Sequence, residues 1–141
     1  MTIDEITNTL PNGFHDSEIL SINIDYQRAE ATFLIDVDLC SPDEEVEVAV
    51  RQGEMKIEGL LYIGIEPPAP RAFSKEYVFD PHKLWISADS SNFSVLKQHP
   101  ELPEPLPDGG FRHWFFDSNN NSFIYVAGMT ASFRWSDNSG T

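Results

Sequence analysis

Hydrophobic and polar residues alternate with a period of two over much of this chain, which is the pattern of half-buried β-strands. From Leu20 to Leu39 apolar side chains occupy one side of the alternation and mostly polar side chains the other, with a break near residues 27–30. This pattern predicts an antiparallel hairpin with one buried face and one face in water.

Two registers of this hairpin keep its apolar faces together. A two-residue loop places Asp25 opposite Glu30, where like charges repel, and its loop residues do not suit the positive φ of a tight hairpin turn. A four-residue loop over 27–30 instead pairs Ile24 with Phe33 and avoids the repulsion between the carboxylates. We therefore predict the second register.

A helix and further strands are predicted by the rest of the pattern. Thr2 and Glu5 have the spacing of a capping box, and we expect a short helix over residues 2–10. Residues 90–97 fit either a helical turn or an irregular strand. Apolar or alternating runs predict strands over 46–50, 55–65, 73–79, 84–88, 111–117, 122–128 and 129–135.

The links between these strands are rich in proline and glycine, which is typical of all-β domains. Residues 98–110 contain four prolines and predict an extended surface loop, and the polar tail 136–141 is expected to fray. We predict one all-β domain over residues 1–141, an antiparallel sandwich or strongly curved sheet of about eight strands with a short N-terminal helix.

Composition and charge exclude several classes of protein. The 141 residues are 40% hydrophobic and 12% aromatic, which suffices for a core, and the net charge of −14 disfavours nucleic acids and anionic membranes as partners. No secretory signal and no membrane-spanning run of ~18–20 apolar residues is present. The single Cys40 cannot form an internal disulfide, so we expect a reducing compartment and a cytoplasmic protein.

The negative charge is concentrated in the first half of the chain. Residues 1–66 contain 15 acidic and 3 basic residues (3 − 15 = −12), whereas residues 67–141 contain 8 and 6 (6 − 8 = −2). If these acidic residues share one surface, that surface would attract a basic partner protein. The alternative is that the negative charge serves solubility alone. The predicted contact residues lie on the first hairpin and beyond it: Asp25, Glu30, Asp36, Asp38, Glu44, Glu45 and Glu47.

Catalytic patterns are weak, and we predict no catalytic residue, metal site or cofactor. The four histidines lack the spacing of metal ligands, and no nucleophile or phosphate-binding motif occurs. The densest polar cluster is the turn Asn12–Asp16, which is either structural or a binding rim that presents His15 and Asp16. A hydrolase or metal-dependent enzyme centred on His15 and Asp16 is the enzymatic alternative.

The aromatic residues suggest two further alternatives. Trp85 or Trp114 could stack on a sugar or another small ligand, although core packing is the usual role of tryptophan in a strand. The strand 111–117 is apolar on both sides, so it is either covered on both faces or leaves an aromatic patch for a partner, including a second copy of the chain.

Two short segments carry a resemblance to known proteins. The run from Leu10 to Ile19, which contains Asn-Gly-Phe-His-Asp, and the later segment 121–126 resemble small bacterial β-rich proteins grouped with the immunity proteins of toxin systems, of the immunity protein 50 kind. The resemblance does not cover residues 45–110 and transfers no catalytic residue. It implies a non-enzymatic binding protein, and an acidic inhibitor would suit a basic nuclease toxin.

Overall fold

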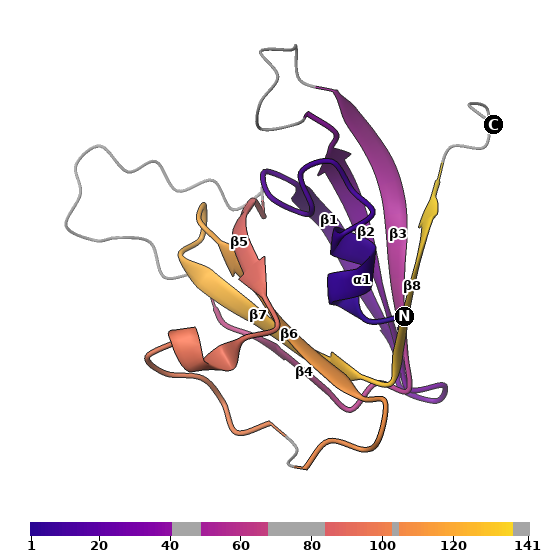
Figure 1. The fold of residues 1–141 in the computed structure, drawn as a ribbon, viewed down its shortest axis with the longest axis vertical. Coiled ribbons are helices and arrows are strands. Elements are labelled where there is room, and N and C mark those ends of the chain that lie inside the picture. Colours follow the sequence, from indigo (N-terminus) through magenta and orange to yellow (C-terminus); the bar gives the residue numbers. More distant parts are fainter. Residues whose placement is uncertain (41–48, 68–83, 103–104, 137–141) are drawn as a thin grey trace.

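The computed structural model describes residues 1–40, 49–67, 84–102 and 105–136, and it confirms the all-β prediction. Two antiparallel sheets of four strands each face one another, converging near the β7–β8 junction, with helix α1 between them (Figure 1). Sheet A has the order β1 (Glu18–Asp25), β2 (Glu30–Asp38), β3 (Val50–Glu58) and β8 (Thr130–Trp135). Sheet B has the order β4 (Tyr62–Ile65), β7 (Ser122–Gly128), β6 (Phe111–Asp117) and β5 (Ile86–Ser90).

The main core fills the space between the sheets. Alternate residues of β2, from Ala31 to Val37, are fully buried, as their alternation predicts. Phe14 joins the two layers because its ring lies 6.0 Å from that of Phe115 in sheet B and 6.3 Å from that of Phe133 in sheet A. Burial of these apolar faces is the main stabilising contribution to the fold.

The predicted register of the first hairpin is wrong. Asp25 lies directly opposite Glu30, because the turn places Ala29 in the left-handed region at φ 52°. The repulsion that argued against this register is offset locally. The Nζ of Lys56 lies 3.5 Å from the Glu30 carboxylate, and Asp25 accepts a hydrogen bond of 3.1 Å from the backbone N–H of Arg28.

A bulge near the start of β1 sets the other end of the hairpin. The register shifts by one residue between Ile19 and Ser21, so that Leu20 is exposed and Glu18 lies opposite Asp36. The extra residue shifts the alternation of buried and exposed side chains by one position, which is the usual effect of a bulge.

The long strand predicted over 55–65 is also wrong, because the chain crosses from one sheet to the other within it. β3 ends at Glu58, Gly59 has φ 61°, and β4 begins at Tyr62 in sheet B. The chain crosses back at Met129, beside the first crossing, where a Cβ on Gly59 would approach the Met129 side chain to 2.8 Å. Two passages of backbone this close require the small residue at the corner.

Helix α1 is shorter than predicted. It covers Ile3–Thr7, while the capping role of Thr2 is confirmed by a hydrogen bond of 3.2 Å from the backbone N–H of Glu5 to the Thr2 hydroxyl. The ambiguous residues 90–97 contain the end of β5 and the 3₁₀ helix η1 (Phe93–Val95). The predicted strand at 73–79, most of that at 46–50 and most of the tail 136–141 lie outside the described residues.

β6 is covered on both faces at its centre. Phe115 packs into the main core, whereas Trp114 and Tyr125 of β7 form a second cluster with Phe93 and Leu102 on the outer face of sheet B. The Leu102 side chain comes from the predicted proline-rich loop and is 8% exposed. This second cluster removes Trp114 from the surface.

Candidate functional site

The described acidic residues of the first hairpin separate into two groups at opposite ends of sheet A. Asp25 and Glu30 lie at one end of the outer face, and Asp36 and Asp38 lie at the other. The sequence-predicted Glu44, Glu45 and Glu47 lie outside the described residues. The four described carboxylates therefore belong to two separate hollows, which differ in their content of basic side chains.

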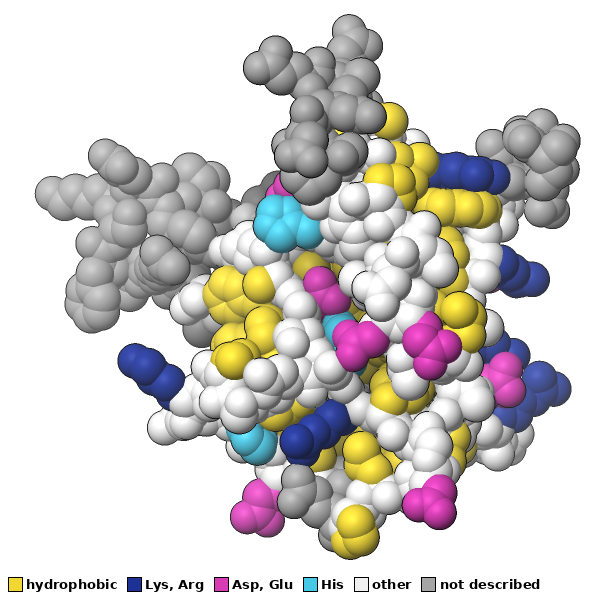
Figure 2. All heavy atoms as spheres, in the orientation of Figure 1, with side chains coloured by type: hydrophobic (Ala, Val, Ile, Leu, Met, Phe, Trp, Pro, Cys, Tyr) yellow, Lys and Arg dark blue, Asp and Glu magenta, His cyan; other side chains and the backbone are white. Residues whose placement is uncertain are grey.

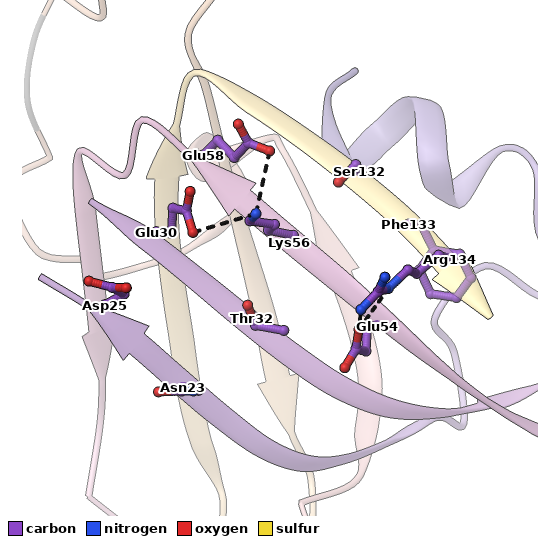
Figure 3. Close-up of a pocket in the computed structure, with 10 residues that line it drawn as sticks. All are labelled: Asn23, Asp25, Glu30, Thr32, Glu54, Lys56, Glu58, Ser132, Phe133 and Arg134. Carbon is purple, nitrogen blue, oxygen red and sulfur yellow. Dashed lines mark hydrogen bonds and ion pairs between the residues drawn. The ribbon is translucent and has the colours of Figure 1, made fainter. Parts of the chain in front are cut away.

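At the first end, basic side chains pair with the acidic ones. We call this the Lys56 hollow; it has a volume of about 600 Å³. Lys56 lies between the carboxylates of Glu30 and Glu58, at 3.5 and 3.9 Å, and Arg134 binds the Glu54 carboxylate at 2.7 Å (Figure 3). The lining comprises Asn23, Asp25, Glu30, Thr32, Glu54, Lys56, Glu58, Ser132, Phe133 and Arg134.

At the other end, four carboxylates and an aromatic ring line one hollow. This Trp85 hollow, of about 350 Å³, is lined by Asp16, Glu18, Asp36, Asp38, Val50 and Trp85. Glu18 and Asp36 are direct cross-strand neighbours, and no Lys or Arg of the described residues belongs to the lining. Four carboxylates with no Lys or Arg in the described lining create a local negative potential.

Backbone pairing between distant segments builds the Trp85 hollow. The N–H of Asp16 donates to the carbonyl of Ile86 at 2.8 Å, and the N–H of Ile19 donates to the carbonyl of Leu84 at 2.9 Å. These bonds place Trp85 beside the start of β1, where its backbone forms a bridge with Glu18. The segment around Asp16 and the segment around Trp85, which are far apart in the sequence, thus form one surface region.

The turn that presents His15 and Asp16 is held by its own polar groups. The Asn12 side chain donates to the carbonyl of His15 at 3.1 Å, and Asp16 has φ 62°. The Asp16 carboxylate lies 3.0 Å from the Nδ1 of His15 and accepts a hydrogen bond of 3.3 Å from the indole N–H of Trp85. The structure therefore unites these three predicted residues, with Trp85 still 38% exposed.

Trp114 is not part of this group, because its side chain is buried elsewhere. It is only 8% exposed, and its indole N–H donates to the carbonyl of Asn92 at 2.9 Å. Of the two predicted tryptophans, Trp85 is the one whose ring a ligand can reach.

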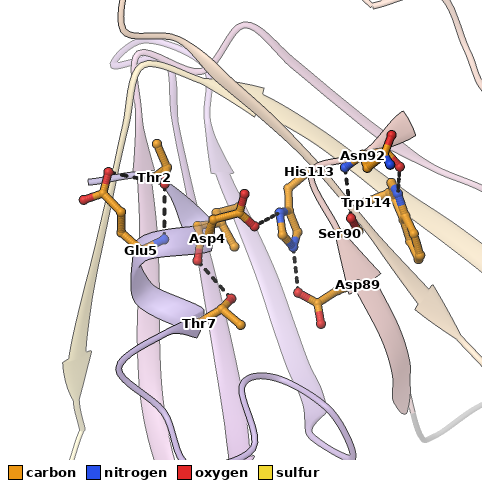
Figure 4. A network of polar contacts seen from close by, with 10 residues as sticks. Thr2, Asp4, Glu5, Thr7, Asp89, Ser90, Asn92, His113 and Trp114 are labelled. Atoms are coloured by element: carbon orange, nitrogen blue, oxygen red, sulfur yellow. Dashed lines mark hydrogen bonds and ion pairs between the residues drawn. The ribbon is translucent and has the colours of Figure 1, made fainter. Parts of the chain in front are cut away.

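A second polar site was missed by the sequence reasoning. His113 is 1% exposed, its Nε2 lies 2.6 Å from a carboxylate oxygen of Asp89, and its Nδ1 lies 3.6 Å from one of Asp4 (Figure 4). The three residues come from β6, β5 and α1, so no spacing along the chain relates them. The only local indication was a histidine between Phe111 and Phe115 on the inward side of a strand.

Among the described residues, no group of three or more His, Cys, Asp and Glu side chains has an arrangement that could hold a metal ion. None of the helices in the described part of the chain is long and apolar enough to cross a membrane.

Comparison with known proteins assigns no family and no activity to this chain. No known protein family matches the sequence, and no curated protein matches it either. Among solved structures, an uncharacterized protein from Neisseria gonorrhoeae is similar, with a TM-score of 0.48 and 15% sequence identity over 86% of this chain and 92% of that one. The chain is thus placed by its own architecture, as a two-sheet all-β protein.

Proposed function

We propose that the protein is a non-enzymatic binding protein whose Trp85 hollow receives a basic side chain of a partner protein. The observation that carries this proposal is the contrast between the two hollows. Lys56 and Arg134 already pair with carboxylates in the Lys56 hollow, whereas the Trp85 hollow has four carboxylates and no Lys or Arg in its described lining.

The chemistry of the Trp85 hollow favours arginine. A guanidinium can stack on the exposed face of Trp85 while its N–H groups donate to neighbouring carboxylates. The indole N–H of Trp85 is already bound to Asp16, which holds the ring in place for such a contact. Long-range attraction to a net charge of −14 would also accelerate association with a basic protein.

An inhibitor of a basic toxin is the particular role we propose for this surface. The likeness of the segments around His15 and 121–126 to toxin-immunity proteins supports it. The acidic surface supports it too, because an inhibitor must bind its target tightly and an acidic surface attracts a basic target. The small-ligand alternative rests on the same exposed Trp85, since carboxylates beside an aromatic ring can also bind sugar hydroxyls.

Two matched double variants test the proposal. Glu18→Gln with Asp36→Asn removes one cross-strand pair from the Trp85 hollow, and Asp25→Asn with Glu30→Gln removes the equivalent pair from the Lys56 hollow. Each variant loses two negative charges. Titration with an octa-arginine peptide, followed by calorimetry and Trp fluorescence, measures the affinity of each.

We expect the first variant to bind the peptide at least about tenfold more weakly and the second to change affinity by less than about twofold. Binding by the native protein should also weaken with added salt. Equal losses in both variants would mean that bulk charge alone attracts the peptide and would contradict the proposal. Salt-independent quenching by a neutral oligosaccharide, without peptide binding, would favour the small-ligand alternative.

A further inference from the structure

An aromatic groove lies on the outer face of sheet B, on the side away from the main core. Two hollows of about 460 and 540 Å³ share Glu66, Gln98 and Tyr125 in their linings and therefore adjoin. Tyr62 lines the first hollow and Phe123 the second, and we call the two together the Tyr62 groove. One wall is the chain after η1, which lies outside sheet B in Figure 1. Hydrophobic side chains reach the surface near η1 on the face seen in Figure 2.

Gly64 allows the Tyr62 ring to take its position in this groove. A Cβ at Gly64 would approach the Tyr62 hydroxyl oxygen to 2.7 Å and a ring carbon to 2.9 Å, so the phenol lies across the bare backbone of the glycine. Tyr62 is only half-buried, so part of its ring stays open to a ligand. An aromatic ring in a hollow is an apolar platform on which the C–H groups of a sugar ring can stack.

Glu66 supplies a carboxylate that β7 holds in place. Its backbone N–H donates to the carbonyl of Phe123 at 3.0 Å. Its side chain accepts hydrogen bonds from the N–H of Phe123 at 2.9 Å and from the Tyr125 hydroxyl at 3.3 Å. These bonds use one acceptor site on each carboxylate oxygen, and each oxygen has a second. Glu66 is therefore a positioned acceptor that can still bind two hydroxyl groups.

The remaining polar groups of the groove favour a neutral ligand. Gln98 is exposed and lines both hollows, and its amide can donate and accept, as a sugar hydroxyl also does. Glu66 would repel an anion, and Lys97 in the second hollow would repel a cation. A wholly apolar ligand would remove water from the Glu66 carboxylate and return no hydrogen bond.

We propose that the Tyr62 groove binds a neutral saccharide. One sugar ring stacks on Tyr62, one of its hydroxyls donates to the Glu66 carboxylate, and another exchanges hydrogen bonds with the Gln98 amide. The second hollow receives the next sugar ring of the chain, beside Phe123. This site does not depend on the Trp85 hollow, whose described lining shares no residue with the groove.

Three neutral trisaccharides are the probes: maltotriose, cellotriose and triacetylchitotriose. Each is titrated into the protein and followed by NMR. We expect at least one of them to produce saturable shifts of the Gly64 and Glu66 amides and of the Gln98 side-chain amide, with a Kd of about 1 mM or tighter. Because the ligand is uncharged, binding should not weaken with added salt, unlike binding of the arginine peptide.

Gly64→Ala tests the platform without removing it. The added methyl group must displace the Tyr62 phenol, and the backbone accepts alanine because Gly64 has no positive φ. Tyr62→Ala removes the ring outright. Both variants should bind the trisaccharide about tenfold more weakly. The matched control Tyr26→Ala, at an exposed tyrosine in the turn between β1 and β2, should change the affinity by less than about twofold.

A second matched pair tests the polar contacts. Gln98→Ala should weaken binding by about tenfold, because it removes a hydrogen-bonding partner of the sugar, whereas Gln27→Ala, at an exposed turn residue, should have less than a roughly twofold effect. The proposal is overturned by the absence of saturable shifts with all three sugars, or by equal losses in a variant and its control. Shifts confined to Asp16 and Trp85 would place the sugar in the Trp85 hollow and would also overturn it.

Discussion

At the scale of single residues, the Glu66 carboxylate accepts two hydrogen bonds from the neighbouring strand β7. Its two oxygens accept hydrogen bonds from the backbone N–H of Phe123 at 2.9 Å and from the Tyr125 hydroxyl at 3.3 Å. Burial, and after it the charge of Glu66, raises the pKa of Tyr125 to about 12, from an ordinary value of 10.0. The neutral phenol is thus the form that the folded protein favours.

This assignment predicts the behaviour of the protein in alkali. Because the folded-state pKa of Tyr125 lies above the unfolded value, its contribution to stability is complete below pH 10 and is lost as the pH rises toward 12. Glu66→Gln should lower the pKa of Tyr125, since the second cause of the shift is removed. Ultraviolet absorbance of phenolate measures the titration. An absorbance transition near pH 12 that persists in Tyr125→Phe would show that another tyrosine is responsible.

At the scale of elements, the turn between β1 and β2 decides the register of the hairpin. Ala29 occupies the left-handed region at φ 52°, where a Cβ is unfavourable. In the resulting register Ile24 lies opposite Ala31 and Ile22 opposite Phe33, and the Nζ of Lys56 on β3 lies 3.5 Å from the Glu30 carboxylate. Contacts beyond the turn thus outweigh the local backbone preference.

Substituting glycine at this position tests that balance. Ala29→Gly should stabilise the protein by about 0.5 kcal/mol, because relief of the left-handed strain exceeds the entropy that glycine adds to the unfolded chain. Ala49→Gly is the control, since Ala49 is exposed and has no positive φ, and it should be neutral or destabilising. Urea denaturation measures both, and a destabilised Ala29→Gly variant would contradict the assigned turn.

At the scale of the whole molecule, Phe14 connects the two sheets. It comes from the turn after α1, is fully buried, and contacts Phe115 of sheet B and Phe133 of sheet A edge-on. The same turn places Asp16 in the lining of the Trp85 hollow, and His15 is paired with the Asp16 carboxylate. The anchor Phe14 and the proposed binding residue Asp16 are therefore only two positions apart in the chain.

Truncating this anchor should destabilise the entire fold. We expect Phe14→Ala to lower the free energy of unfolding by about 3–5 kcal/mol, because it removes a large buried ring and leaves a cavity between the sheets. Tyr26→Ala, at a side chain that is 87% exposed, should change it by less than about 0.5 kcal/mol. Similar losses in the two variants, measured by urea denaturation, would contradict the bridging role of Phe14.

The elements that sequence reasoning predicted well depend on local pattern. The bounds of β6 and β7, at 111–117 and 122–128, agree with the prediction because two apolar runs and the polar Asn turn between them lie within one short stretch. The elements that were predicted wrongly are fixed by contacts between segments that are distant in the sequence. Nothing near Met55 indicates that the strand must end at Gly59, because the reason is the second crossing of the chain at Met129.

By itself, the sequence of this protein determined its class, its outward acidic positions and its buried alternation, since these follow from local periodicity and composition. Only the tertiary structure decided which charges share a surface. It paired Lys56 with Glu30, gathered Asp36 and Trp85 into one hollow, and enclosed His113 between carboxylates from two other elements. Charge and hydrogen bonding act through distance in space, and the folding of the two sheets sets those distances.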